Sequence, residues 1–396
     1  MYFTGLQYLK IDIANSYGLD KMNWDVRLKW TDAHEHELEQ LIPFAEEPAQ
    51  FLAGVLALRK TQAGIATGYM CGLDATASGI QLLAILSGCR VSAESVNLTG
   101  CPDRQDAYTR CYARINEILG TSGVIPRADV KRALMTAMYG SKAEPLKIFG
   151  KDTPELAAFY QTIDEMLPGV NLLNKALIGL WQEDTLAHEW TLPDGFDVNI
   201  KVLVEVEYEV EFADKPHVIR LKHNLPKKGG ISLGANTIHS IDGMIVREMN
   251  RRCNFDVDHV ARLFNMTGGG TSTTRPKDEK LLRLLLLSEA SGFFSAAILD
   301  VLDAQNYGLL DPDHVRALKM LLLSMQKSFP LVAIHDCFKF HPNNGNDVRD
   351  HYRNILAELA SSTVLVHIAS QITGRVMGSI ADDISDLVAD SDYALS

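Results

Sequence analysis

The segment from Pro126 to Lys142, Pro-Arg-Ala-Asp-Val-Lys-Arg-Ala-Leu-Met-Thr-Ala-Met-Tyr-Gly-Ser-Lys, constrains this chain more than any other stretch. Proline suits the first turn of a helix, where its missing N–H costs nothing, and Gly140 suits a helix end, where a left-handed residue is needed. At about 100° per residue, Arg127 and Lys131 lie about 40° apart and Tyr139 lies roughly 80° further round. The segment therefore predicts a helix with two cations and one phenol on a single stripe.

This stripe has two interpretations. The two cations can grip phosphates while the ring meets a sugar or a base, which is the chemistry of a nucleoside triphosphate site. Alternatively, the segment is an amphipathic surface helix whose arginine and lysine side chains are solvated. Two further motifs favour the first interpretation.

The first motif runs from Gly68 to Leu86, where a short apolar run ends at Asp74 and an apolar helix is predicted from about Ser78. Asp74 is therefore predicted at a strand-to-helix corner. A carboxylate there projects past the end of the strand, where a hard cation and its phosphate can reach it. The alternative is an aspartate that caps the following helix.

The second motif runs from Ser328 to Pro342, where two apolar runs flank His335 and Asp336. This pattern predicts a β-hairpin with an acid at its tip. An isolated carboxylate is costly to bury, so Asp336 is either exposed at a turn or coordinated. Two such acids from distant segments suggest a divalent-metal pair, because two Mg²⁺ ions about 3.5–4 Å apart activate an attacking hydroxyl and are bound by carboxylates.

These motifs resemble those of the single-subunit, phage and mitochondrial type of DNA-directed RNA polymerase. The segment from Asp74 to Gln81 is similar to motif A of that family, Arg127-x-x-x-Lys131 through Tyr139-Gly140 to motif B, and His335-Asp336 to motif C. All three follow the order of the family. The resemblance extends to most of the chain apart from residues 251–325, and it includes the stretches Tyr8–Lys21, Trp190–Phe196 and Ile238–Gly243.

The resemblance implies a template-directed nucleotidyl transfer that makes RNA from rNTPs on DNA. Asp74 and Asp336 would hold two Mg²⁺ ions, and the carbonyl of Ala75 would be a further ligand. Arg127 and Lys131 would bind the incoming triphosphate, and Lys131 would also act in catalysis.

The remaining implied roles concern the sugar and the new base pair. Tyr139, next to Gly140, would sense the ribose and position the base pair. His239 would lie near the primer end or the minor groove, and His335 would orient the metal site. An isolated histidine is more often packed or solvent-facing, so only the surrounding His-Ser-Ile-Asp-Gly motif supports the role of His239.

The sequence also departs from the family. Ala75 stands where relatives often have glycine, and Leu82 stands where histidine is common. The chain begins at a point well inside its long relatives, so we expect it to lack the promoter-binding amino-terminal domain and most of the thumb. No Asp-x-x-Gly-Arg element, which contacts the template in the family, occurs in the sequence.

This pattern looks like the larger, catalytic subunit of the two-subunit RNA polymerases of enquatrovirus-like podophages. The resemblance implies a second subunit that supplies the amino-terminal and thumb portion and docks on residues 1–64. Further implied partners are template DNA and RNA product, with a single-stranded DNA-binding accessory protein as a candidate. The implied location is the cytoplasm of an infected bacterial host. The alternative is an incomplete or degenerate gene product, against which the intact motif residues argue.

The expected fold class is α+β, mostly helical, with the palm and fingers of a right-hand polymerase. In chain order, the first expected parts are a helical partner-docking segment (residues 1–64), the palm with motif A (65–91), and the fingers with motif B and a β-hairpin near 198–222 (92–238). The return to the palm (239–250) comes next, followed by an insertion with a Gly/Thr loop and helices at 278–304 and 312–327 (251–325). The last part is the palm with motif C and carboxy-terminal helices (326–396). The hairpin either reaches toward a promoter or is a plain β-ribbon.

Composition limits these expectations. A net charge of −12 counts against unaided DNA binding, because nucleic-acid binders usually carry a basic surface. Arg127, Lys131 and neighbouring cations can still form a local positive channel. The six cysteines show no Cys-x-x-Cys pair, so zinc is not expected. Charged residues interrupt the apolar run from Leu281 to Leu302, which predicts a buried helix.

Two rival functions remain open. A DNA polymerase shares the cationic stripe and the two acids, but the segment from Ile238 to Gly243 favours RNA synthesis. The second rival is a scaffold subunit of a transcription complex that keeps the fold without turnover.

Overall fold

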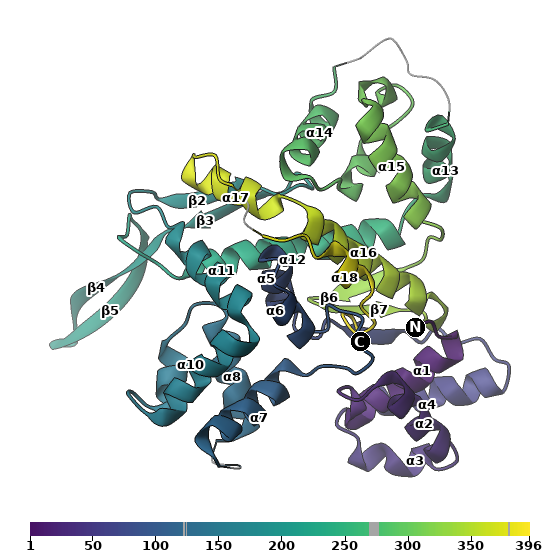
Figure 1. The fold of residues 1–396 in the computed structure, drawn as a ribbon, viewed down its shortest axis with the longest axis horizontal. Helices are drawn as coiled ribbons and strands as arrows, with labels where there is room; N and C mark the ends of the chain where they lie inside the picture. The colour runs from purple at the N-terminus through teal and green to yellow at the C-terminus, as the bar shows by residue number, and fades with distance from the viewer. Residues whose placement is uncertain (122, 124, 269–276, 379–380) are drawn as a thin grey trace.

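The computed structural model describes residues 1–121, 123, 125–268, 277–378 and 381–396. Helices predominate, and the described strands form three small antiparallel sheets, which confirms the mostly helical α+β class (Figure 1). The predicted Gly/Thr loop falls largely on residues 269–276, outside the described residues. No single described helix is long and apolar enough to cross a membrane, although the bent pair Pro342–Ser361 and Val364–Thr373 reaches that length and composition together.

The first 64 residues are mostly helical, as predicted. Their elements are α1 (Gly5–Ala14), the π-helical turn η1 (Asn15–Leu19), α2 (Trp24–His34), α3 (Leu38–Leu41), the 3₁₀ turn η2 (Ile42–Phe44) and α4 (Pro48–Gln62). Thr4 and Gln7 begin α1 with a capping box, in which each side chain accepts a hydrogen bond from the other residue's backbone N–H. One side of α1 is buried in the main core, so this helical group packs directly against the central sheet.

The central sheet has the strand order β1-β7-β6 and is antiparallel throughout. Its strands are β1 (Cys71–Asp74), β6 (Leu331–Ile334) and β7 (Cys337–Phe340). Helix α5 (Ser78–Leu86) follows β1 at the predicted corner, and β6 and β7 form the predicted hairpin. Successive side chains of a strand point to opposite faces, so Phe338 and Phe340 are buried while Cys337 and Lys339 face the other side.

Residues 92–185 are mainly helical, as predicted. The first helix, α6 (Arg90–Ser95), begins just before this range. It is followed by α7 (Ala107–Leu119), α8 (Arg127–Ala137), α9 (Ala143–Phe149), α10 (Pro154–Met166) and α11 (Pro168–Gly179). Pro126 is the N-cap of α8. The predicted three-turn stripe is wrong at its end, because α8 stops at Ala137 and Tyr139 lies in the following turn, before Gly140 at φ 83°.

Two further sheets follow, and one of them is the β-hairpin predicted near 198–222. Strand β2 (Ala187–Thr191) pairs with β3 (Asp197–Lys201), and β4 (Leu203–Phe212) pairs with β5 (Lys215–Asn224). Strands β3 and β4 are separated at Val202, whose side chain is buried and whose N–H donates to the Leu186 carbonyl at 2.8 Å. The β4–β5 ribbon extends away from the rest of the fold, with mostly exposed side chains on both faces (Figure 1).

The described residues after β5 are mainly helical apart from β6 and β7. The remaining elements are α12 (Ser232–Cys253), α13 (Val257–Met266), α14 (Glu279–Ser291), η3 (Ala296–Asp300), η4 (Tyr307–Leu309), α15 (Pro312–Ser324), η5 (Pro342–Asn344), α16 (Gly345–Ser361), α17 (Val364–Thr373) and α18 (Ser385–Ala389). The single helix predicted at 278–304 is wrong: α14 ends at Ser291 because Gly292 adopts φ 66° and caps it. Parts of α13, α14 and α15 share a small core of their own, apart from the main core.

A buried ionic network joins α12 to α16 and η3. Arg252 has no exposed surface and donates to both carboxylate oxygens of Glu358, at 2.7 and 2.6 Å. Its Nε donates to Glu248 at 3.2 Å, and the fully buried Glu248 also accepts from Ser295 and from the backbone N–H of Ala296. Because α12 also carries His239 and Asp242, this network fixes a helix that contributes to the candidate site.

Candidate functional site

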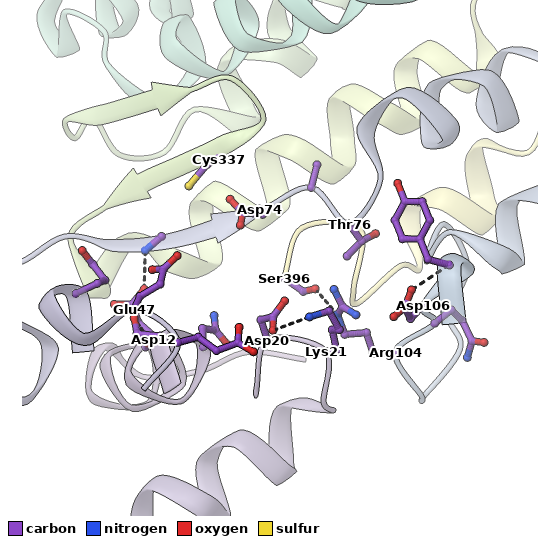
Figure 2. A pocket seen from close by; sticks show the side chains of 18 of the residues that line it. Asp12, Asp20, Lys21, Glu47, Asp74, Thr76, Arg104, Asp106, Cys337 and Ser396 are labelled. Atoms are coloured by element: carbon purple, nitrogen blue, oxygen red, sulfur yellow. Dashed lines mark hydrogen bonds and ion pairs between the residues drawn. The ribbon is translucent and has the colours of Figure 1, made fainter. Parts of the chain in front are cut away.

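A cavity of about 550 Å³ opens beside the carboxyl end of β1. Its walls come from α1, η1 and the start of α4 on one side, from β1 and β7 at its floor, and from α7 and α8 on the other. Of the predicted site residues, Asp74, Ala75, Arg127 and Lys131 line it. Figure 2 shows Asp74 near the middle of this cavity, with Asp12 and Cys337 on one side and Arg104 and Asp106 on the other.

Asp74 is the last residue of β1 and its side chain is exposed. The N-cap of α5 is Ala77, without a side-chain cap, so Asp74 does not cap the next helix and that alternative is excluded. Its partner in register on β7 is Cys337. Burial raises the pKa of the Cys337 thiol to about 12, and its hydrogen bond with Asp74 adds to the rise, so the thiol stays protonated at neutral pH.

Asp336 lies in the two-residue turn between β6 and β7, next to His335 at φ 56°. The backbone N–H of Ala75 donates to the Asp336 carbonyl at 3.1 Å. Asp74 and Asp336, far apart in sequence, are therefore brought next to each other, with Asp74 at the end of β1 and Asp336 in the turn that precedes β7. Asp336 does not line the cavity as it stands, although Asp74 and Ala75 do.

A third carboxyl group, that of Asp242 on α12, lies close enough to Asp336 to interact with its charge. Burial raises the pKa of Asp242 to about 6, the charge of Asp336 adds to the rise, and His335 opposes it. The cause is the concentration of negative charge in a partly desolvated place. A cation bound here would relieve that repulsion, so the environment of these acids suits a divalent metal.

The two cations of α8 lie on one wall of the cavity. The Arg127 guanidinium donates through Nε to the Thr109 hydroxyl at 2.7 Å, and its Nη2 pairs with Asp106, the N-cap of α7. The Lys131 ammonium lies 5.4 Å from the centroid of the Tyr108 ring. Across the part of the chain that the structure describes, no carboxylate lies within ion-pair distance of that ammonium, so its charge is available to a ligand.

Tyr139 and His239 pack against each other and are not among the residues that line the cavity. Their ring centroids are 5.0 Å apart. The Tyr139 hydroxyl packs on Gly79, where an added Cβ would lie 2.2 Å from the oxygen, so Gly79 leaves room for the phenol. Burial raises the pKa of Tyr139, and the charges of Asp242 and Asp336 add to this effect. The structure thus brings motif-B, motif-C and α12 residues together, next to the cavity that holds Asp74.

Several residues of the site were not singled out by the sequence analysis. Lys21 and Arg104 add two cations to the cavity, and Asp106 and Tyr108 contact the cations of α8. Lys21 could have been found, because it ends the Tyr8–Lys21 stretch that carries the family resemblance. Arg104 and Tyr108 lie in no quoted motif. The packing of α7 against α8 brings Tyr108 to the site, and Arg104, which precedes α7, is held there by hydrogen bonds with Asn23 and Ser396.

The turn that presents Asp20 and Lys21 to the cavity is held by a buried arginine. The Arg27 guanidinium has no exposed surface and donates to the carbonyls of Asp20 and Met22, at 2.6 and 2.9 Å, and to the side chain of Asn15 at 3.0 Å. Burial lowers the pKa of Arg27 to about 9. All its acceptors are neutral, so Arg27 is a buried positive charge that fixes the shape of this wall.

A separate group of candidate metal ligands lies in the 251–325 region. Glu289, Asp311 and His314 have ligand atoms within 4.8 Å of one another. None of the three lines the cavity, and the sequence analysis did not predict the group. Asp311 caps α15 by accepting from the backbone N–H of His314 at 2.8 Å, so its position is already explained by helix capping.

Comparisons with known proteins place these observations in context. Residues 3–147 match the family of DNA-dependent RNA polymerases, and this range contains Asp74, Arg127, Lys131 and Tyr139. The chain is 30% identical over 173 residues to a DNA-directed RNA polymerase of Pseudomonas phage phiKMV, covering 35% of this chain and 21% of that protein. It is 32% identical over 175 residues to a probable DNA-directed RNA polymerase of Neurospora crassa, covering 37% and 20%.

A mitochondrial DNA-directed RNA polymerase of Arabidopsis thaliana is 27% identical over 172 residues, covering 35% of this chain and 18% of that protein. The matched part of the chain thus spans about a fifth of the length of these curated relatives. The similarity supports the single-subunit type of polymerase, of phages and mitochondria, as the group to which the chain is related.

Proposed function

We propose that this chain is the catalytic subunit of a two-subunit, phage-type RNA polymerase that adds rNTPs to a growing strand on a DNA template. The observation that carries the proposal is the β1–β7 pairing, which brings Asp74 and Asp336 to adjacent positions beside a cavity that the cations of α8 line. The similarity of residues 3–147 to DNA-dependent RNA polymerases supports the same reaction.

The described residues suit divalent cations. Asp74 and Asp336 offer carboxylate oxygens, the hard ligands that Mg²⁺ prefers, and Asp242 places a third carboxyl group beside Asp336. The Ala75 carbonyl is the third proposed ligand. When bound, a pair of Mg²⁺ ions would lower the pKa of the attacking hydroxyl and stabilise the departing pyrophosphate.

The other side chains position the substrates. Lys131 and Arg127 bind the triphosphate, and Lys21 and Arg104 supply further positive charge to the same cavity. Tyr139 contacts the ribose, and His239, whose ring packs at 56° to that of Tyr139, lies beside the new base pair. The Trp190 indole donates to Ser240 at 3.1 Å and so holds α12 next to His239. Catalysis by these groups consists mainly of positioning and of charge stabilisation.

The division into parts follows from this assignment. The β1-β7-β6 sheet with α5 and α12 is the palm, α7 to α11 belong to the fingers, and residues 251–325 are an insertion. The helices of residues 1–64 form the docking surface for the second subunit, which would supply the thumb portion. In support, Phe44, Leu52 and Leu56 are exposed on this group, where apolar side chains would otherwise face water.

An extension assay tests the proposed function. The purified chain, with and without its candidate partner subunit, is mixed with primed single-stranded DNA, Mg²⁺ and either rNTPs or dNTPs. We expect partner-dependent addition of rNTPs, with a further gain if a single-stranded DNA-binding protein is required. Addition of dNTPs in preference would favour the DNA polymerase, and no addition in any mixture would favour the scaffold.

Tyr139→Phe is expected to weaken the discrimination between rNTPs and dNTPs by roughly three- to tenfold while extension continues, because one hydrogen bond of the hydroxyl is worth about 0.5–1.5 kcal/mol. Phenylalanine fits the space over Gly79, since only the hydroxyl oxygen is lost. The measurement is the ratio of kcat/KM for rNTP and dNTP incorporation on a primed template. Tyr160→Phe, on α10 outside the site, is the matched control, and an unchanged ratio for Tyr139→Phe would exclude the ribose contact.

A further inference from the structure

Lys339 is a cation on the floor of the cavity that the motifs did not identify. It lies on β7 opposite Gly72 of β1, two residues beyond Cys337, which pairs with Asp74. Its neighbours Phe338 and Phe340 point into the core, so Lys339 and Cys337 share the face of the sheet that lines the cavity. The ammonium therefore lies on the same surface as the Asp74 carboxylate.

The side chain of Lys339 lies across Gly72. A Cβ added to Gly72 would be 3.2 Å from Nζ and 3.7 Å from Cε of Lys339, so the missing side chain of glycine leaves the path for the lysine. The Gly72 N–H donates to Asp12 at 2.8 Å, which holds this part of β1 in place. The strand is thus shaped to present the ammonium over its surface.

Lys339 does not use its charge in an ion pair. Among the residues that the structure describes, no carboxylate oxygen lies within 4.0 Å of its Nζ. The nearby Asp12 carboxylate is buried and is instead satisfied by the Tyr69 hydroxyl at 2.5 Å and by the Gly72 N–H. A half-buried ammonium that faces a cavity without a paired anion is suited to bind an anionic ligand.

Lys339 and the cations of α8 lie on opposite sides of Asp74. Lys339 belongs to the side of Asp12 and Cys337, and Arg127 pairs with Asp106 on the other side, as Figure 2 shows for Asp12, Cys337, Asp74 and Asp106. Two residues of a β-strand span about 7 Å, so Lys339 lies about that distance along β7 from Cys337, the residue that pairs with Asp74. The cavity therefore has positive charge on both sides of its acidic centre.

Nucleotidyl transfer brings phosphate groups to both sides of the reacting centre. The attacking and the leaving oxygens lie roughly in line on opposite sides of the reacting phosphorus. If the departing pyrophosphate is bound by Arg127 and Lys131, the strand that attacks must approach from the side of Lys339. We propose that Lys339 binds a backbone phosphate of the growing strand just behind its 3′ end, an assignment that rests on the proposed function.

The alternative role for Lys339 is a structural one, as a distant counter-charge for buried Asp12. The two roles differ in their salt dependence. A phosphate contact releases a condensed counterion, so its loss lowers the slope of log affinity against log salt by about 0.7 to 1. Loss of an internal counter-charge lowers the thermal stability of the protein and leaves that slope unchanged.

The experiment compares Lys339→Gln with the wild type, with the charge-keeping Lys339→Arg, and with Lys319→Gln, an exposed lysine of α15. Each is assayed with the partner subunit if extension requires it. For Lys339→Gln we expect the KM for primed template to rise about three- to tenfold, the KM for rNTP to stay unchanged, and the salt slope of primed-template binding to fall by about 0.7 to 1. Lys339→Arg and Lys319→Gln should behave as the wild type.

The outcomes separate the two proposals. If the wild type adds no nucleotide in any mixture, the proposed function fails and this assignment fails with it. If the wild type is active and Lys339→Gln keeps its KM for primed template and its salt slope, only the assignment of Lys339 is overturned. An increase in the KM for rNTP instead would place Lys339 with the triphosphate and would also overturn it.

Discussion

Replacing Asp74 or Asp336 with asparagine is expected to lower nucleotide addition by at least about a thousandfold and to leave the fold intact. Losing one electrostatic stabiliser from a preorganised site already costs about 100- to 1,000-fold, and each of these carboxylates is proposed to hold the metal pair itself. The Asp74 side chain is exposed and that of Asp336 is only partly buried, so neither substitution leaves an unpaired buried group. The measurement is kcat on a primed template, with circular dichroism to confirm folding.

The design includes two controls. Asp386→Asn changes an exposed aspartate of α18 by the same atoms and should keep full activity. The double variant of Asp74 and Asp336 should be about as inactive as either single variant, because residues that act as one unit are not additive. Full activity of either single variant would reject the metal assignment, since a ligand of the reacting metals cannot be dispensable.

Arg252→Met is expected to lower the free energy of unfolding by about 3–5 kcal/mol, because it leaves Glu248 buried without its cation. Glu248 has no exposed surface, and Arg252 links it to Glu358 on α16. The measurement is the midpoint of urea denaturation at constant slope. A loss below about 1 kcal/mol would mean that the network contributes little to the cohesion of α12 and α16.

Matched variants isolate the buried charge as the cause. Arg316→Met removes an exposed arginine that pairs with Asp313 one turn away, and it should change the unfolding free energy by less than about 1 kcal/mol. Adding Glu248→Gln to Arg252→Met removes the uncompensated carboxylate, so the double variant should regain part of the lost stability. If the double variant is no more stable than Arg252→Met, lost packing and not unpaired charge explains the effect.

Local patterns predicted much of the fold. The corner at Asp74, the helix from Ser78 and the hairpin with Asp336 in its turn follow from short-range alternation and turn residues, and the structure has all three. The errors occur where a distant contact overrides the pattern. The hairpin predicted near 198–222 begins only at Leu203, because the backbone of Val202 bonds to Leu186, its side chain enters the core, and the residues before it pair with β2 instead.

The candidate site was predicted only in part, for a related reason. The motifs supplied Asp74, Arg127 and Lys131, which line one cavity. Arg104 lies in no quoted motif, and Lys339 lies in the segment from Ser328 to Pro342 but was given no role there. Hydrogen bonds of Arg104 with Asn23 and Ser396, and the pairing of β7 with β1 in one register, bring the two residues to the same cavity. A one-residue shift in that register would turn Lys339 toward the core and Phe338 toward the cavity.

The sequence by itself determined which side chains are present and where strands, turns and most helices form, because these depend on neighbours a few residues apart. The tertiary structure alone decided that Asp74 and Asp336 become neighbours, that Asp242 and Lys339 join them, and that Tyr139 leaves its helix to pack on Gly79. These relations depend on strand register and helix packing between distant segments. Burial of the shared core selects them, and no single segment encodes that burial.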